Sequence, residues 1–462
     1  MMPILNEEEL IRSHADFFHV FTNSIKPESA FRIGPEAEKC GVFLADASPV
    51  MYERADGISG ILAQFIERYG WAPESESEGG PVISLQKNGA SITLEPGGQL
   101  ELSGKAVDNV HQVCAEFVRH MLELKPISEQ LGIRWLGLGF QPFATRSDLS
   151  WVPKMRYGVM REYLPTRGAF ALDMMLRTCT VQANFDYSSE IDAMRKMRVG
   201  LKLSPLTAAM FANSPFYEKK RSDALSMRSR VWLDVDNDRS GLIPPLWAES
   251  SRFEDYVEWA LDVPMFMLKR NGKKVANTGQ TFRDFWRNGY KGHRASEGDW
   301  QTHLNTLFPE VRLKNTIEVR SADSQGPAEV CALPALWTGI YYDEQALNEA
   351  EAMAADWSLA EIEQLRSQVW RTALRTEFKG SPLVKVAEQL LEIAEGGLER
   401  RGRKEECGRD ERVHLKGLKR LIARGMCPAE AILERLGDGP LNPQAIIKAA
   451  DLGAAFAHLA SE

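Results

Sequence analysis

Five segments of the sequence alternate apolar side chains with carboxylate, amide, hydroxyl or arginine side chains. Successive side chains of a β-strand point to opposite faces, so each segment predicts a strand with one apolar and one polar face. The polar faces carry Glu36 and Glu38; Gln99, Glu101 and Ser103; Thr180, Gln182, Asn184 and Asp186; Arg228 and Arg230; and Thr316, Glu318 and Arg320.

Taken singly, each segment is explained well enough by a half-exposed strand with its polar face in water. The set is different, because its polar faces carry acceptors and arginines rather than the usual lysines and threonines. Carboxylates two apart on a strand repel one another unless cations lie between them. The predicted oxygen-rich cavity is formed by Glu36, Glu38, Glu95, Glu101 and Glu318.

Such a cavity favours particular chemistry. Hard cations such as Mg²⁺ prefer oxygen ligands, and nucleotide phosphates often complete the coordination shell. Arg228 and Arg320 are suited to carboxylate or phosphate groups, because the planar guanidinium donates two parallel hydrogen bonds. The residues alone therefore predict an ATP·Mg²⁺ enzyme that acts on an anionic small molecule, on one face of a curved sheet.

Composition excludes several other classes. The chain has 462 residues, of which 44% are hydrophobic and 26% charged, as in ordinary globular proteins. The net charge of −8 argues against a nucleic-acid partner. Six cysteines are too few for a disulfide framework, and no Cys/His spacing predicts a zinc site. The longest apolar run, 331–342, is too short to cross a membrane, and the first residues are acidic where a signal peptide is basic. We therefore expect a cytoplasmic protein without a membrane partner.

The order of predicted elements indicates an α+β protein. No GxGxxG or P-loop motif is present, and regular βαβ spacing is missing, which disfavours a Rossmann or P-loop fold. We expect a catalytic body over 1–342 and a helical C-terminal region over 343–462, packed together as one continuous unit. The elements expected are helices at 6–22, 49–70, 105–131, 189–211, 252–261 and 328–342; strands at 31–45, 97–104, 178–186, 226–236, 264–270 and 315–321; an 82–86/91–95 hairpin; and a turn at Asn271-Gly272.

The same polar segments resemble the glutamate–cysteine ligase family in its plant and proteobacterial form. The match runs from about residue 31 to residue 437, and the number, order and spacing of the motifs make it specific. It includes FRIGPEAEKCGVF (31–43), EPGGQLELSG (95–104), PKMRYGVMREYLP (153–165), ALDMMLRTCTVQANFDYSSE (171–190), LSMRSRVWLDVDNDRSGLIP (225–244), FPEVRLKNTIEVRSAD (308–323) and CALPALWTG (331–339).

The resemblance implies a curved, mostly antiparallel six-stranded sheet with a glutamine-synthetase-like catalytic face. It implies that ATP drives the joining of L-glutamate to L-cysteine through a γ-glutamyl phosphate, which gives γ-glutamylcysteine for glutathione synthesis. The substrates would be the small molecules L-glutamate, L-cysteine and ATP, with Mg²⁺ as cofactor. We expect a monomer or a homodimer.

The family motifs also imply roles for individual residues. The metal ligands would be Glu36, Glu38, Glu95, Glu101 and Glu318, and the catalytic groups would be Glu101, Glu318 and Arg320, with Arg320 near the ATP phosphates. The glutamate-binding arginines would be Arg156 and Arg228. The floor and walls of the substrate pocket would come from Gln182, Asn184, Tyr157, Met265 and Phe266.

Three further expectations follow from the resemblance. Pro35 and Ala37 replace the family's usual Thr and His, and Pro35 cannot donate a ladder hydrogen bond, which predicts an edge or bulged position. Cys114 and Cys331 match the partners of one of the two disulfides of the plant enzymes; composition alone favours two separate thiols. Two alternatives stay open: a related carboxylate–amine ligase with another amine acceptor, and a non-catalytic regulatory relative.

Overall fold

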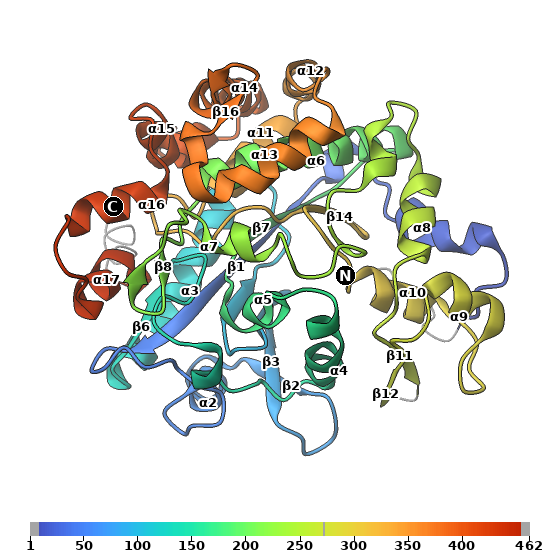
Figure 1. Cartoon of the computed structure of the whole chain (residues 1–462), viewed down its shortest axis with the longest axis horizontal. Helices are drawn as coiled ribbons and strands as arrows, with labels where there is room; N and C mark the ends of the chain where they lie inside the picture. The colour runs from blue at the N-terminus through green and yellow to red at the C-terminus, as the bar shows by residue number, and fades with distance from the viewer. Residues whose placement is uncertain (1–8, 271–272, 454–462) are drawn as a thin grey trace.

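A nine-stranded antiparallel sheet forms the centre of the protein (Figure 1). The computed structural model describes residues 9–270 and 273–453. The strand order is β14-β15-β7-β1-β5-β4-β3-β2, with β6 paired to the far end of β1. The strands are β1 (Ile33–Phe43), β2 (Ala72–Ser75), β3 (Val82–Lys87), β4 (Ala90–Leu94), β5 (Leu100–Ser103), β6 (Ile133–Leu136), β7 (Val181–Phe185), β14 (Val311–Leu313) and β15 (Ile317–Val319).

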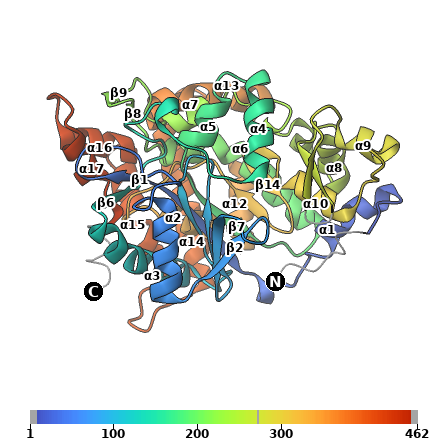
Figure 2. The ribbon, with the colours of Figure 1, turned by 90° about the horizontal axis from the view of Figure 1, so that it is seen from below.

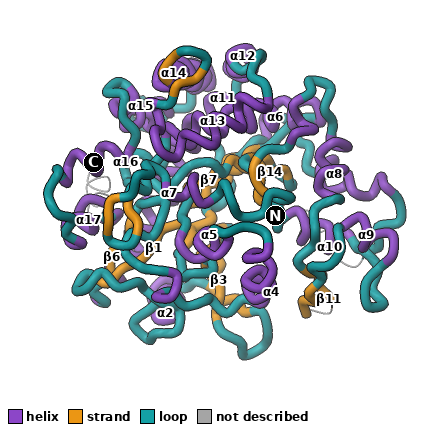
Figure 3. The backbone as a smooth tube through the Cα atoms, viewed as in Figure 1, coloured by secondary structure: helices purple, strands orange, loops and turns teal. Residues whose placement is uncertain are grey.

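Helices surround the sheet, which confirms the α+β prediction. Figure 3 shows the strands running through the middle of the molecule and several long helices along one side. The helices are α1 (His19–Thr22), α2 (Ile58–Tyr69), α3 (Val110–Gln130), α4 (Met155–Tyr163), α5 (Ala171–Arg177), α6 (Glu190–Met210), α7 (Met227–Val231), α8 (Phe253–Leu261), α9 (Phe282–Asn288), α10 (Glu297–Leu304), α11 (Ala332–Tyr341), α12 (Glu344–Met353), α13 (Leu359–Thr372), α14 (Leu383–Arg401), α15 (Lys416–Ile422), α16 (Pro428–Leu436) and α17 (Pro443–Ala450).

The apolar face of the sheet is covered by α6 and α11, with α13 packed on α6 and α14 on α11. The strand residues beneath them, such as Phe185, Ile317 and Val319, are buried. Burying a side chain of this size contributes roughly 1.5–3 kcal/mol. Because side chains alternate, the same strands present Gln182 and Glu318 on the opposite face, where the cavity described below lies.

Strand β1 holds the centre of the sheet between β5 and β7. An edge position for Pro35 is therefore wrong, whereas the bulged alternative agrees with the register. Ile33 faces Val107, but Glu36 faces Ser103, so the partner segment contains one residue more than β1 at this point. The carbonyl of Pro35 accepts a hydrogen bond from the Gly104 amide, so the missing N–H leaves β1 paired on both sides.

The β3–β4 hairpin forms as predicted. Its turn residues Asn88 and Gly89 have φ of 53° and 85°, the left-handed pair that a type I′ turn requires. Several smaller elements differ from the predictions. The segment 226–236 contains helix α7 rather than a strand, and its first turn is capped by Ser226, which accepts a hydrogen bond from the Ser229 amide. The sheet has nine strands rather than six, because β2, β6 and β14 join it as well.

Two predicted elements include residues that lie outside the described ranges 9–270 and 273–453. The expected helix over 6–22 is helical from residue 14 onward, as the 3₁₀ helix η1 (His14–Phe18) followed by α1, and its first residues lie outside the described ranges. The turn at Asn271-Gly272 also lies outside them; it follows β11 (Met267–Arg270), which pairs with β12 (Lys273–Ala276). Among the residues described, no helix combines the length and apolar character needed to cross a bilayer.

The two ends of the molecule are helical (Figure 2). Helices α8, α9 and α10 gather with α1 at one end, and α16 and α17 lie at the other in both views. The C-terminal region adds the short β16 (Glu377–Phe378) and β17 (Ser381–Pro382) pair, where no strand is predicted. Because α14 packs on both α11 and α6, we propose that 1–342 and 343–462 form one continuous structural unit.

Candidate functional site

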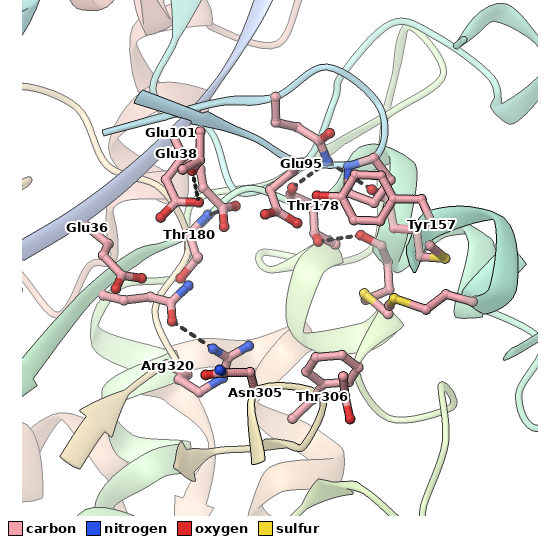
Figure 4. Close-up of a pocket in the computed structure, with 18 of the residues that line it drawn as sticks. Glu36, Glu38, Glu95, Glu101, Tyr157, Thr178, Thr180, Asn305, Thr306 and Arg320 are labelled. Carbon is pink, nitrogen blue, oxygen red and sulfur yellow. Dashed lines mark hydrogen bonds between the residues drawn. The ribbon is translucent and has the colours of Figure 1, made fainter. Parts of the chain in front are cut away.

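A cavity of about 380 Å³ opens on the polar face of the sheet. Its walls come from β1, β5, β7, β15, α4 and α7 and from the turn after β4. Figure 4 shows acidic side chains pointing into one side of this cavity and Arg320 pointing in from the other. The predicted site residues that line it are Glu36, Glu38, Glu95, Glu101, Arg156, Tyr157, Gln182, Arg228, Glu318 and Arg320.

Glu38, Glu95 and Glu101 form an acidic cluster in which carboxylate oxygens lie within 4.8 Å of one another. Glu38 and Glu101 are directly paired residues of β1 and β5, and Glu95 enters from the turn that joins β4 to β5. Burial raises the pKa of Glu38 well above its usual value, and the charges of Glu95 and Glu101 raise it further. Three crowded carboxylates are the donor set that a hard divalent cation accepts, so the residues present fit Mg²⁺.

Neighbouring side chains fix the orientation of these carboxylates. Glu101 accepts hydrogen bonds from Thr93 Oγ1 at 2.8 Å and from Ser103 Oγ at 2.7 Å. Glu38 Oε2 accepts from the backbone amide of Thr180 at 2.9 Å. These hydroxyl and amide donors were not predicted from the sequence, although Ser103 shares the polar face of the Glu101 strand.

Glu36 lies beside the acidic cluster rather than within it. Its Oε1 accepts a hydrogen bond from Asn184 Nδ2 at 2.8 Å. Burial raises its pKa to about 7, and the charges of Glu318 and Glu101 add to the shift. Asn184 does not itself line the cavity, so its part in the site is to hold Glu36 in place.

Glu318 has a different environment, because its carboxylate is surrounded by cations. Arg312 donates from Nε to Oε2 at 2.8 Å and from Nη2 to Oε1 at 3.0 Å. Lys314 Nζ lies 3.0 Å from Oε2, and Arg320 Nη1 lies 2.7 Å from Oε1. Although burial alone would raise its pKa, these three cations hold the pKa of Glu318 well below its usual value. Glu318 is therefore separate from the acidic cluster and organises the arginines of the opposite wall.

Two arginines predicted to bind anions converge on this wall. Arg228 Nη2 donates to the backbone carbonyl of Arg320 at 2.7 Å, and Arg320 Nη1 donates to Gln182 Oε1 at 2.9 Å. Helix α7, which carries Arg228, is anchored through its cap: Ser226 Oγ donates to Asp323 Oδ1 at 2.8 Å. The structure thus brings Arg228 to its predicted place from a helix instead of a strand.

The remaining cationic wall belongs to α4 and the residues before it. Arg156 Nη2 donates to the Tyr157 hydroxyl at 3.0 Å and lies 3.9 Å from Glu95 Oε1. The Tyr157 hydroxyl donates to the carbonyl of Leu94 at 2.6 Å, which ties α4 to β4. Lys154 reaches the same carbonyl at 2.8 Å, and burial lowers its pKa to about 8, with the charge of Arg156 contributing.

Met265 and Phe266 do not line the cavity, contrary to expectation. Both are buried. Met265 contacts Asn277, and the guanidinium carbon of Arg239 lies 3.9 Å from the ring centroid of Phe266. Phe308, whose ring centroid lies 6.5 Å from that of Phe266, forms this part of the wall instead. Thr180, from the predicted polar face of the Gln182 strand, also lines the cavity. Other lining residues that the sequence did not single out are Met174, Met175, Thr178, Trp232, Asn305, Thr306 and Arg312.

The two cysteines expected to pair lie together. Cys114 on α3 and Cys331, which caps α11, have Cα atoms 5.8 Å apart and their sulfur atoms form a disulfide. The other four cysteines have free thiols: Cys40, Cys179, Cys407 and Cys427. We propose that this disulfide forms in the folded protein under oxidising conditions.

The disulfide gives a first prediction. It closes a loop of 217 residues, for which the chain-entropy account allows about 5 kcal/mol of stabilisation as an upper figure. Oxidised protein should melt at a higher temperature than reduced protein, and Cys114→Ser should remove the difference, whereas Cys407→Ser, at an exposed free thiol, should retain it. Free thiols at residues 114 and 331 in folded, air-oxidised protein, measured by non-reducing peptide mapping, would exclude the pairing.

The raised pKa of Glu36 gives a second prediction, on the protein without metal. Between pH 4.5 and about 7, folded protein keeps a proton on Glu36 that the unfolded chain has released. Stability is therefore lost as pH rises through this window. We expect Glu36→Gln to melt like the wild type below about pH 4.5. As the pH rises from there to about 7, the variant should melt at an increasingly higher temperature than the wild type, and above that the difference should be constant. A melting difference that is the same at every pH would contradict this assignment.

Comparison with known proteins gives a consistent result. The family model of Glutamate-cysteine ligase family 2 (GCS2) matches residues 32–449. The chloroplastic glutamate–cysteine ligase of Medicago truncatula is 44% identical over 422 residues, which are 91% of this chain and 81% of that protein. The Arabidopsis thaliana protein of the same name is 44% identical, over 91% of this chain and 79% of its own. A crystal structure of glutamate–cysteine ligase from Francisella tularensis, in complex with AMP, shares the fold: its TM-score is 0.56 at 13% identity, over 93% of this chain and 91% of that one.

The comparisons also correct one expectation. The plant relatives of Medicago truncatula, Brassica juncea, Arabidopsis thaliana and Oryza sativa are all named as chloroplastic proteins. The expectation of a cytoplasmic location is therefore wrong by this comparison. That expectation rested on the acidic first residues and on the short length of the longest apolar run, 331–342.

Proposed function

The chain belongs to glutamate–cysteine ligase family 2, and on that premise we propose that the cavity on the polar face of the sheet is its active site. The enzyme joins the γ-carboxylate of L-glutamate to the amine of L-cysteine while ATP is converted to ADP and phosphate. The product, γ-glutamylcysteine, is formed in the first step of glutathione synthesis. The observation that carries the assignment is the acidic cluster facing two arginines across one cavity.

We propose a division of work between the two walls. Glu38, Glu95 and Glu101 would hold Mg²⁺, which when bound neutralises phosphate charge and polarises the reacting oxygens. Arg320 would face the phosphate groups, and its guanidinium is oriented by hydrogen bonds to Glu318 and Gln182. Phosphoryl transfer between two anions depends mainly on positioning and charge neutralisation, which these walls supply.

Glutamate binding is assigned to Arg156 and Arg228. Both guanidiniums line the cavity. Arg156 donates to the Tyr157 hydroxyl and Arg228 to the Arg320 carbonyl, and each keeps other N–H groups for a ligand. A planar fork binds a carboxylate through two parallel hydrogen bonds and so fixes the direction of the substrate. Phe308 and Trp232 line the same cavity and provide apolar wall.

The assay that tests the function measures ADP release with glutamate and a panel of amines. We expect Mg²⁺- and glutamate-dependent turnover that rises sharply with L-cysteine, together with γ-glutamylcysteine detected by mass spectrometry. Turnover with another amine in preference to cysteine would instead favour a related carboxylate–amine ligase. No turnover with any amine would favour a non-catalytic relative, although every predicted metal ligand and both glutamate-binding arginines are present.

Replacing Arg228 by lysine gives a third prediction. Lysine keeps the charge but lacks the planar fork, so glutamate should lose a charge-assisted hydrogen bond worth about 1.5–3 kcal/mol. The KM for glutamate should rise about ten- to a hundredfold, while the KM for ATP changes little. Arg230→Lys is the matched control, because Arg230 lies on the same helix but pairs with Asp223 at the surface. An unchanged glutamate dependence in Arg228→Lys would remove Arg228 from the substrate site.

A further inference from the structure

Two imidazoles and one carboxylate converge between the start of α3 and the C-terminal helical region. Nδ1 of His111, on α3, lies 2.9 Å from Glu405 Oε1. The same nitrogen lies 2.9 Å from Nε2 of His414, in the 3₁₀ helix η7 (Glu411–Leu415). The three potential ligand atoms are all within 4.8 Å of one another. None of these three residues lines the active-site cavity, so the group is independent of the proposed function.

Hydrogen bonds alone cannot pair His111 Nδ1, His414 Nε2 and Glu405 Oε1 with one another. A neutral imidazole carries one N–H, and two facing ring nitrogens at this distance can share only one hydrogen. Glu405 Oε1 is a second acceptor directed at the same His111 nitrogen. Nε2 of His111, the outer ring nitrogen, is buried without a hydrogen-bond partner. The polar contacts that orient this ring are therefore those of Nδ1. Three lone-pair atoms therefore meet around one hydrogen, an arrangement that a bound cation resolves.

The surrounding groups hold the three residues in this orientation. The second oxygen of Glu405 accepts hydrogen bonds from Arg409 Nε at 3.0 Å and from the Cys407 thiol at 3.1 Å. Nδ1 of His414 lies 3.3 Å from Sγ of Cys114. A disulfide sulfur carries no hydrogen, so His414 must donate in this contact, and its Nε2 keeps the lone pair. Outer partners of this kind fix the tautomer and orientation of metal-binding residues.

We propose that His111 Nδ1, His414 Nε2 and Glu405 Oε1 form a zinc site beside the Cys114–Cys331 disulfide. Two imidazoles and one carboxylate, with a fourth position left for water, are a ligand set that Zn²⁺ accepts, whereas Mg²⁺ prefers oxygen ligands alone. His111 and His414 are 303 positions apart in the chain. A zinc ion bound here would therefore tie α3 to the C-terminal helical region.

The test is equilibrium dialysis of full-length, air-oxidised protein against Zn²⁺ in excess Mg²⁺, followed by metal analysis. We expect one zinc per chain at this site. Glu405→Gln, His111→Gln and His414→Gln should each weaken its binding by more than the roughly 10–100-fold typical of losing an outer partner. His14→Gln is the matched control: His14 Nε2 also contacts a carboxylate, Glu258, at 2.7 Å, but within 9–270 and 273–453 no second imidazole joins that pair to make a metal-binding group. The control should bind zinc like the wild type.

Zinc could also enter the acidic cluster of the cavity, so Glu101→Gln is included to separate the two sites. Zinc that is lost in Glu101→Gln and retained in Glu405→Gln would overturn the proposal, as would wild-type protein that retains none. A second readout does not depend on dialysis: Zn²⁺ should raise the melting temperature of the wild type but not of Glu405→Gln. Glu405 suits this test because its side chain is 27% exposed, so that its replacement leaves the core intact.

Discussion

Glu101→Gln should abolish γ-glutamylcysteine formation while leaving the fold intact. Glutamine keeps the shape and both contacts: its amide oxygen accepts from one of Thr93 and Ser103, and its NH2 group donates to the other hydroxyl, which rotates to accept. It removes one of the three charges of the acidic cluster. Lewis-acid stabilisation by a bound metal is worth several kcal/mol, and each 1.4 kcal/mol changes the rate tenfold, so turnover should fall roughly a thousandfold or more.

The stability of the same variant has an expected sign. Without Mg²⁺, the charge of Glu101 repels Glu38 and helps to raise its pKa, so its removal should leave the melting temperature equal to or above that of the wild type. Glu123→Gln is the control, since Glu123 pairs with Lys87 away from the cavity and its loss should not affect turnover. Activity close to that of the wild type in Glu101→Gln would remove Glu101 from the metal site.

Glu318→Gln is expected to lose both activity and stability, which distinguishes it from Glu101→Gln. Glu318 is fully buried, and its two oxygens contact Arg312, Lys314 and Arg320. Removing one member of a buried ion pair costs about 3–5 kcal/mol, because the remaining charges stay buried without compensation. The unfolding free energy measured by urea denaturation should fall by about this amount. Family resemblance treats the two glutamates alike as metal ligands, and only their contacts separate them.

An exposed ion pair provides the reference for this measurement. Glu434 pairs with Arg424 at the surface, where both side chains are about half exposed. Exposed pairs contribute 0–1 kcal/mol, so Glu434→Gln should unfold at almost the wild-type denaturant concentration. Equal destabilisation by Glu318→Gln and Glu434→Gln would show that the cation network around Glu318 does not stabilise the fold.

Alternation of side chains correctly predicted most of the strands that line the cavity. The segments carrying Glu36, Glu101, Gln182 and Glu318 are strands of one sheet, and their pairing places the polar faces together. The segment carrying Arg228 alternates equally well but forms α7. Over five residues, a period of two is hard to distinguish from a helical period, and the Ser226 cap decides the outcome.

Other features depend on pairing in three dimensions and could not be predicted. Arg312 reaches Glu318 because the β14–β15 hairpin places these two residues directly opposite each other. Nothing in the separation of the two residues indicates this register. Met265 and Phe266 lie in an apolar run that suits a core strand as well as a cavity wall, and the core is where they are found. The pairing of Cys114 with Cys331 was expected from family resemblance alone.

One measurement tests the assignment of the active site most directly. Purified wild-type protein and Glu101→Gln are each incubated with ATP, Mg²⁺, L-glutamate and L-cysteine, and γ-glutamylcysteine and ADP are quantified together by mass spectrometry. The proposed site predicts equal amounts of γ-glutamylcysteine and ADP from the wild type and almost none of either from the variant. Wild-type protein that releases neither product, or a variant that forms γ-glutamylcysteine at the wild-type rate, would contradict it.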